Sequence, residues 1–149
     1  MTARHAHFTI EEMTEYLKEV FPQAAIGEQF IVEELAPMRA KLRLTFDAKH
    51  LRPGGTISGP TMFALADVAL YVAVLGQIGR VKLAVTTNIN INFLKKPSPA
   101  DLIGEARLLK LGKRLAVGEV AIHSAAESEL VAHAVGTYSI PARGIDVVS

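Results

Sequence analysis

The stretch from His50 to Gly79, HLRPGGTISGPTMFALADVALYVAVLGQIG, decides the fold. It begins as a loop rich in glycine and proline and continues as a long apolar run that predicts a helix. Pro60 suits the first helical position, where its missing N–H and fixed φ cost nothing, with Gly59 or Ser58 as the N-cap. Nearly every turn of this run is apolar or small, so we expect the helix to be buried on most sides.

Asp67 is the only formally charged residue between Arg52 and Arg80. A lone carboxylate in an apolar helix is costly unless it is paired, hydrogen-bonded or functional. It follows Pro60 by seven residues, about 10 Å along the axis, so it cannot act at the N-terminus of its own helix. In a two-fold dimer, Asp67 of one chain could face the Gly59 end of the other. The alternative is a structural Asp bonded to a Ser, Thr or Asn on a covering strand, which leaves the glycine-rich entry unexplained.

The composition indicates one globular domain without a strong overall charge. The chain has 149 residues, half of them apolar, and a net charge of +1, so no global field attracts nucleic acid. Without cysteine, the chain has no disulfides, thiol nucleophiles or thiolate metal sites. Residues 61–79 approach membrane-spanning length, but the central Asp67 and Gly76 argue against a membrane protein. No signal peptide is recognisable in the first residues, and we expect a cytoplasmic protein.

The rest of the chain predicts one further helix and six strands. Residues 9–21 form an amphipathic helix with a capping box, interpreted either as a lid over a pocket or, as we favour, as a helix packed on the edge of the domain. Alternation with a period of two then predicts strands. The expected strands are residues 28–36, 38–46, 82–95, 101–111, 114–124 and 129–140.

This order predicts an α+β fold in which an antiparallel sheet of about six strands curls around the central helix. We expect a single domain over residues 1–149, with an N-terminal helical extension at 1–27 and a frayed tail at 141–149. One small sheet cannot cover every side of an apolar helix. Part of its exposed stripe should therefore meet a second subunit.

Three segments carry a resemblance to a known family: RPGGTISGPTMFALADVA, TTNININFLKKP and LGKRLAVGEV. Together with the order of elements, they resemble the hotdog-fold acyl-CoA thioesterases of the PaaI-like, phenylacetate-degradation type, over about residues 28–140. The most specific feature is an acidic residue eight positions after the glycine of a glycine-rich turn. The resemblance implies hydrolysis of acyl-CoA thioesters by a homodimer or homotetramer with sites between subunits. We expect no metal and no cofactor, coenzyme A being part of the substrate.

The resemblance also assigns roles to particular residues. Gly59 matches the glycine whose N–H polarises the thioester carbonyl, Asp67 matches the catalytic carboxylate contributed across the dimer, and Thr86 matches a residue that positions water or the carboxylate. Two further segments match the coenzyme A channel. The residues that we expect to bind substrate or coenzyme A are Arg52, Ser58, Phe93, Leu94, Lys95, Lys96, Lys110, Gly112, Lys113 and Arg114.

Two positions depart from the family pattern. The usual His-Gly-Gly is Ser58-Gly59-Pro60 here, which leaves the Gly59 N–H in place. A common Asn is replaced by Arg52, which could pair with Asp67 or bind a carboxylate on the acyl group. These departures keep a non-catalytic acyl-CoA binding or sensing protein as the main alternative. A hotdog hydratase or dehydratase is a third possibility, although no histidine lies convincingly in its expected role.

The chemistry predicted for the site is thioester hydrolysis. Asp67 can act as a general base for water or attack directly, and both routes stay open. The Gly59 N–H would stabilise the developing oxyanion, a contribution of about 3–4 kcal/mol for one well-placed donor. Histidines 5, 7, 50, 123 and 133 show no metal-binding spacing beyond His5-x-His7, and no GxSxG or P-loop motif is present.

Overall fold

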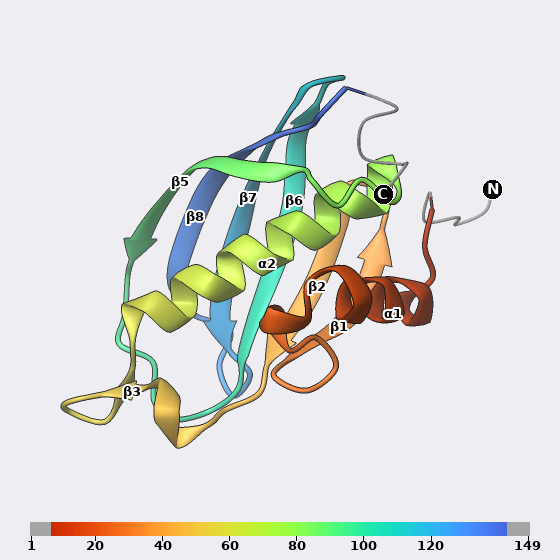
Figure 1. Cartoon of the computed structure of the whole chain (residues 1–149). Helices are drawn as coiled ribbons and strands as arrows, with labels where there is room; N and C mark the ends of the chain where they lie inside the picture. The colour runs from red at the N-terminus through yellow and green to blue at the C-terminus, as the bar shows by residue number, and fades with distance from the viewer. Residues whose placement is uncertain (1–6, 143–149) are drawn as a thin grey trace.

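The computed structural model describes residues 7–142. Its six-stranded antiparallel sheet has the strand order β1-β2-β6-β7-β8-β5 and curves around helix α2 (Figure 1). The strands are β1 (Phe30–Ala36), β2 (Arg39–Leu44), β5 (Val85–Phe93), β6 (Leu102–Leu111), β7 (Leu115–Ser124) and β8 (Leu130–Ser139). This is the α+β hotdog arrangement that the resemblance implies, and every expected strand is present.

Helix α2 (Gly59–Ile78) is the core of the molecule. Ser58 is its N-cap: the Ser58 hydroxyl accepts a hydrogen bond from the Thr61 N–H at 3.3 Å. Twelve of the twenty helical residues are buried, as the nearly uniform apolar sequence predicts. The helix is long and apolar enough to cross a membrane, but two thirds of its most apolar window is buried inside the protein. It is therefore the core helix of a folded domain, as its central Asp67 suggested.

Helix α1 (Ile10–Val20) lies on the same side of the sheet as α2 (Figure 1). Its start is fixed by the predicted capping box, in which Thr9 and Glu12 bond each other's backbone N–H groups at 3.1 and 2.9 Å. Met13 and Leu17 are fully buried. The favoured interpretation, a helix packed on the domain, is thus confirmed, although its last residues also line a cavity described below.

Short elements occupy the connections. Two 3₁₀ turns, η1 (Pro22–Ala24) and η2 (Ala48–His50), follow α1 and β2. A small hairpin of β3 (Leu51–Arg52) and β4 (Thr56–Ile57) then forms the glycine-rich entry to α2. Gly54 and Gly55, at its tip, both have positive φ, the backbone conformation that favours glycine. The expected tail at 141–149 lies mostly outside the described residues, as do residues 1–6 of the N-terminal extension.

Strand β5 lies at one edge of the sheet, and its local geometry departs from simple alternation. The expected strand 82–95 is shorter, because the segment before Val85 turns through hydrogen bonds from Val81 to Gly79 and from Ala84 to Val81. The pairing of β5 with β8 shifts register between Thr86 and Asn88. Such a bulge changes which face a side chain occupies, and it brings Thr86 onto the α2 side of the sheet.

Candidate functional site

Asp67 projects from the middle of α2 and is held through one of its two carboxylate oxygens. Its Oδ1 accepts hydrogen bonds from the Thr86 hydroxyl at 2.6 Å and from the Tyr138 hydroxyl at 2.7 Å. The Tyr138 hydroxyl also lies 2.9 Å from the Asp67 carbonyl oxygen. Oδ2 of Asp67 accepts no hydrogen bond from the described residues. The carboxylate is therefore oriented by strands β5 and β8 while one oxygen stays available.

Tyr138 is well suited to remain a donor in this cluster. Burial raises the pKa of its phenol strongly, and the neighbouring Asp67 charge raises this pKa further. The ring is stacked on Tyr71 with centroids 6.0 Å apart. Sequence reasoning missed Tyr138, because it is 71 residues from Asp67 and its position in β8 has no distinguishing pattern.

A cavity of about 270 Å³ lies beside Asp67. Its walls come from α2, the segment leading into β5, strand β8 and the end of α1. The lining consists mainly of apolar and aromatic side chains. The residues are Val20, Phe21, Asp67, Val68, Tyr71, Lys82, Ala84, Val85, Thr86 and Tyr138.

Gly59 lines a different cavity, of about 360 Å³, at the N-terminus of α2. Its N–H has no acceptor among the described residues. Pro60 has no N–H, and the Thr61 N–H is taken by Ser58, so Gly59 carries the free donor of the first turn. The ring of Phe93 lies close to the backbone at Gly59, and a Cβ there would lie 3.1 Å from Cζ of Phe93. A larger residue at this position would crowd the ring.

The Gly59 cavity gathers several of the residues predicted to bind substrate. Arg52 is exposed, and its Nη1 donates to the Pro53 carbonyl at 3.4 Å. Within one chain, Arg52 lines the Gly59 cavity and does not line the cavity beside Asp67. Lys95 is held by Glu127 and Glu129, each at 2.9 Å, whereas Lys96 makes no ion pair with the described residues. The cavity lining is Arg52, Thr56, Ile57, Gly59, Met62, Phe93, Leu94, Lys95, Lys96 and Pro97.

The remaining predicted residues lie at the other end of α2. Gly112, Lys113 and Arg114 line a third cavity, of about 700 Å³, together with Ile78 at the last turn of the helix. The Arg114 Nε donates to the Ile140 carbonyl at 2.9 Å. Since twenty helical residues span about 30 Å, one chain does not bring this basic turn near Gly59. Lys110 lies near the end of β6 and is exposed.

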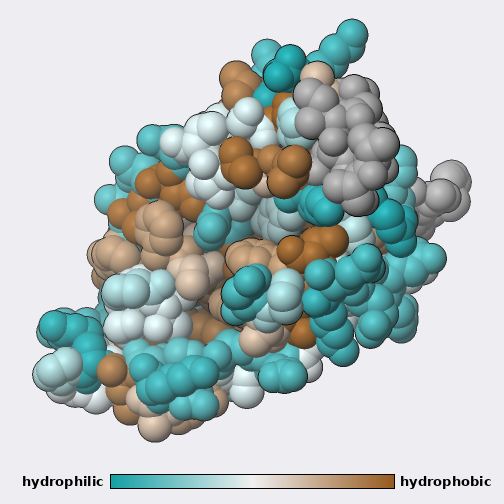
Figure 2. Space-filling model, in the orientation of Figure 1, coloured by the Kyte–Doolittle hydropathy of each residue, from teal (hydrophilic) through white to brown (hydrophobic). Residues whose placement is uncertain are grey.

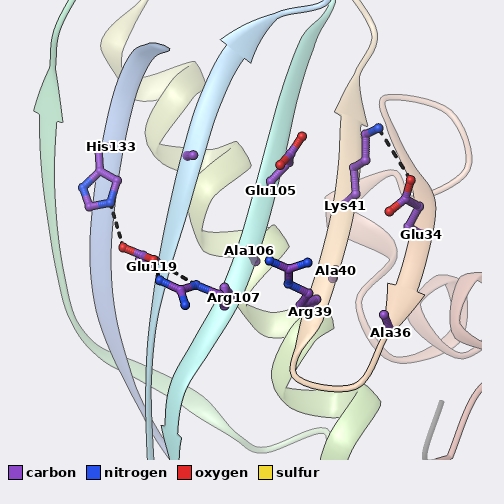
Figure 3. Close-up of a pocket in the computed structure, with 11 residues that line it drawn as sticks. Glu34, Ala36, Arg39, Ala40, Lys41, Glu105, Ala106, Arg107, Glu119 and His133 are labelled. Carbon is purple, nitrogen blue, oxygen red and sulfur yellow. Dashed lines mark hydrogen bonds and ion pairs between the residues drawn. The ribbon is translucent and has the colours of Figure 1, made fainter. Parts of the chain in front are cut away.

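A fourth hollow, of about 420 Å³, lies on the face of the sheet turned away from α2 (Figure 3). Its charges are mostly neutralised within the chain: Glu119 binds Arg107 and His133, and Lys41 lies 3.6 Å from Glu34. These hydrogen bonds from Arg107 and His133 lower the pKa of Glu119. Residues 7–142 contain no group of three or more His, Asp or Glu side chains arranged to hold a metal ion.

Comparison with known proteins shows which family the chain resembles. The family model of the thioesterase superfamily matches residues 54–131. A protein from Saccharolobus solfataricus that carries the provisional name of an esterase is 33% identical over 132 residues, covering 89% of this chain and 85% of its own.

Solved structures agree in fold. A provisionally named thioesterase from Silicibacter sp. TM1040 is 46% identical, with a TM-score of 0.83 over 94% of this chain and 96% of its own. A variant of the phenylacetic acid degradation protein PaaI from Thermus thermophilus is 26% identical, with a TM-score of 0.68 over 85% of this chain and 99% of its own. The chain therefore belongs to the thioesterase superfamily and has the hotdog fold of its PaaI-like members.

Proposed function

We propose that this protein hydrolyses acyl-CoA thioesters, with Asp67 and Gly59 as its catalytic groups. Membership of the thioesterase superfamily supports hydrolase activity in general. The observation that carries the finer proposal is the state of the Asp67 carboxylate, which is oriented through Oδ1 and open at Oδ2 on the wall of a cavity. An oxygen without a partner among the described residues at a cavity wall is the arrangement that a base acting on water requires.

In the proposed reaction, Asp67 Oδ2 removes a proton from water, and the resulting hydroxide attacks the thioester carbonyl carbon. The carbonyl oxygen becomes an oxyanion, which accepts a hydrogen bond from the Gly59 N–H at the positive end of α2. When the intermediate collapses, the C–S bond breaks and the thiolate of coenzyme A takes up the proton. Alternatively, Oδ2 attacks the carbonyl carbon, the C–S bond breaks to release the thiolate of coenzyme A, and water hydrolyses the resulting anhydride to the free acid and the Asp67 carboxylate, its proton passing to the thiolate.

The two groups are proposed to meet across a homodimer. Gly59 and Asp67 are eight residues apart, about 12 Å along one helix, and they line different cavities. The surface around them favours a second copy, because strand β5 lies at the edge of the sheet and apolar side chains gather over α2 and β5 (Figure 2). The exposed apolar residues of these elements and their flanks are Phe63, Leu83, Val85, Phe93 and Leu94.

The polar part of coenzyme A is proposed to lie along the basic residues of the Gly59 cavity. Arg52 and Lys96 make no ion pair with described residues and are free to contact phosphate. Lys95 would first have to leave Glu127 and Glu129, so we expect it to contribute less. Lys113 and Arg114 could reach the same ligand only from the partner subunit.

Steady-state hydrolysis of a panel of acyl-CoA thioesters tests the proposal, with Asp67→Asn as the matched variant. The amide retains the size of the carboxylate and can still accept from Thr86 and Tyr138, but it cannot act as a base. We expect hydrolysis by the wild type and loss of more than about 99% of kcat in the folded variant, since the general base alone contributes roughly 10²- to 10⁴-fold. If the wild type binds acyl-CoA without hydrolysing it, the protein is instead an acyl-CoA binding or sensing module. Unchanged turnover in Asp67→Asn would refute the catalytic assignment.

A further inference from the structure

The cavity beside Asp67 extends to the end of α1, an element outside the matched family segment of residues 54–131. Val20 is the last residue of α1 and Phe21 caps it, and both line this cavity. The Phe21 ring meets the Tyr71 ring edge-on, with centroids 6.1 Å apart and planes at 84°. Tyr71 in turn stacks on Tyr138, which bonds Asp67. A continuous row of aromatic rings thus runs from α1 to the carboxylate.

The lining of this cavity suits a compact, mainly apolar group, with Lys82 as the one charged residue besides Asp67. The Tyr138 hydroxyl is engaged by Asp67 and the Tyr71 hydroxyl by the Lys82 carbonyl at 2.8 Å, so the rings present mainly apolar surface. The volume of about 270 Å³ lies below the usual range for drug-sized ligands. An acyl group whose carbonyl is beside Asp67 would enter this space.

The backbone of Phe21 is fixed at the end of α1, which places its ring at the cavity wall. Its N–H donates to the Leu17 carbonyl at 2.8 Å, and Leu17 is fully buried. Further toward the N-terminus, the guanidinium of Arg80, which follows α2, lies 5.5 Å from the ring of Tyr16 in α1 and 4.8 Å from that of Phe8, which precedes α1. Phe21 as a whole residue is 37% exposed and also lines the cavity, so it lies between the cavity and solvent.

We infer that Phe21 closes the acyl end of the Asp67 cavity and limits the length of the acyl group. This inference rests on the proposed thioesterase function and deepens it. A chain that is too long would have to displace the ring from Tyr71 or pass beside it. A smaller residue at position 21 would open a path past the end of α1.

The test is kcat/KM for straight-chain acyl-CoA substrates of graded length, from butanoyl to hexadecanoyl, measured for the wild type, Phe21→Ala and Phe21→Trp. Each methylene accommodated in an apolar pocket is worth roughly 10-fold or more in kcat/KM. We therefore expect Phe21→Ala to raise kcat/KM by at least about 10-fold for chains beyond the wild-type optimum. Phe21→Trp should move the optimum to shorter chains, and it tests the inference even if the alanine variant fails to fold.

Tyr16→Ala is the matched control, because it removes an aromatic ring from α1 without touching the Asp67 cavity. It should lower the melting temperature and leave the chain-length profile unchanged. Profiles of both Phe21 variants that coincide with the wild type would overturn the inference, as would a Tyr16→Ala profile that shifts like that of Phe21→Ala. Absence of hydrolysis for every acyl-CoA in the wild type would instead refute the proposed function.

Discussion

At the scale of single residues, the asymmetry of the Asp67 carboxylate makes the hydroxyls of Thr86 and Tyr138 the groups that orient the proposed base. Each donates to Oδ1, and neither contacts Oδ2. Removing either hydroxyl should allow the carboxylate to rotate within the cavity. A hydrogen bond to a charged group contributes about 1.5–3 kcal/mol, which corresponds to roughly 10- to 100-fold in rate if it is fully expressed in the transition state.

We therefore predict that Thr86→Val and Tyr138→Phe each lower kcat about 10- to 100-fold with little change in KM. Thr87→Val is the control, because the Thr87 hydroxyl donates to the Thr137 carbonyl on β8 instead. Steady-state kinetics of the three variants provide the measurement. Wild-type kcat in both Thr86→Val and Tyr138→Phe would show that the carboxylate needs no orientation.

His50 is a second residue with a measurable consequence. It is buried, with 7% of its surface exposed, and its Nδ1 has no partner among the described residues. Burial lowers the pKa of this imidazole below its ordinary value of 6.5. Below pH 6.5 the unfolded chain therefore binds more protons at this position than the folded chain, and folding stability falls as the pH falls.

We predict that His50→Leu removes this part of the acid sensitivity. The free energy of unfolding, measured by urea titration at about pH 7.5 and about pH 5.5, should decrease less in His50→Leu than in the wild type. The difference is limited to about 1.4 kcal/mol per pH unit for one proton. Equal acid sensitivity in the wild type and His50→Leu would contradict the lowered pKa.

At the scale of elements, the position of α2 on the sheet depends on two glycines that face each other in adjacent strands. Gly118 of β7 pairs with Gly136 of β8, and a Cβ on either would lie within 2.8 Å of a methyl group of Leu70 on α2. A Cβ on Gly118 would also lie 3.0 Å from the Arg107 carbonyl oxygen, which belongs to the backbone and cannot easily move. Leu70 thus packs directly on the backbone of the strands.

Two glycine-to-alanine substitutions should consequently have opposite effects. Gly118→Ala should lower the free energy of unfolding by about 1–3 kcal/mol, as expected for overpacking. Gly76→Ala, inside α2, meets only a Leu35 methyl at 3.9 Å and should raise stability by up to about 1 kcal/mol through helix propensity. Urea unfolding monitored by circular dichroism measures both. An unchanged free energy of unfolding in Gly118→Ala would mean that α2 can shift on the sheet.

The helices and most strands were predictable from the sequence, because their apolar residues recur with a long and regular period. The boundaries of β6, β7 and β8 lie within one residue of the expected segments. The bulge in β5 was not predictable, since strict alternation with Ile89 and Ile91 would turn Thr86 outward with the asparagines. The contact between Thr86 and Asp67 was expected only from family resemblance. The contact between Tyr138 and Asp67 depends on the pairing of β8 with β5 in three dimensions. No local sequence pattern indicates that pairing.

At the scale of the whole molecule, one chain carries the two halves of the proposed site in separate places. Asp67 lies in the cavity lined by the end of α1, whereas the free Gly59 N–H lies in the cavity at the start of α2. Both cavities adjoin β5, which lines the first with Val85 and the second with Phe93. A two-fold axis beside β5 and the exposed stripe of α2 would bring each Asp67 toward the partner's Gly59, and it would produce two equivalent sites.

Mixing two inactive variants tests this arrangement. Asp67→Asn removes the base, and Gly59→Val hinders the approach to the N–H, where even a Cβ would crowd Phe93. In a heterodimer of the two, one site combines both substitutions and the other combines the intact Asp67 with the intact Gly59. Purified heterodimers carrying two different affinity tags should therefore regain about half of the wild-type kcat per dimer, and random mixtures about a quarter. If each site were built within one chain, both sites of the heterodimer would remain defective, and verified heterodimers would be as inactive as their parents.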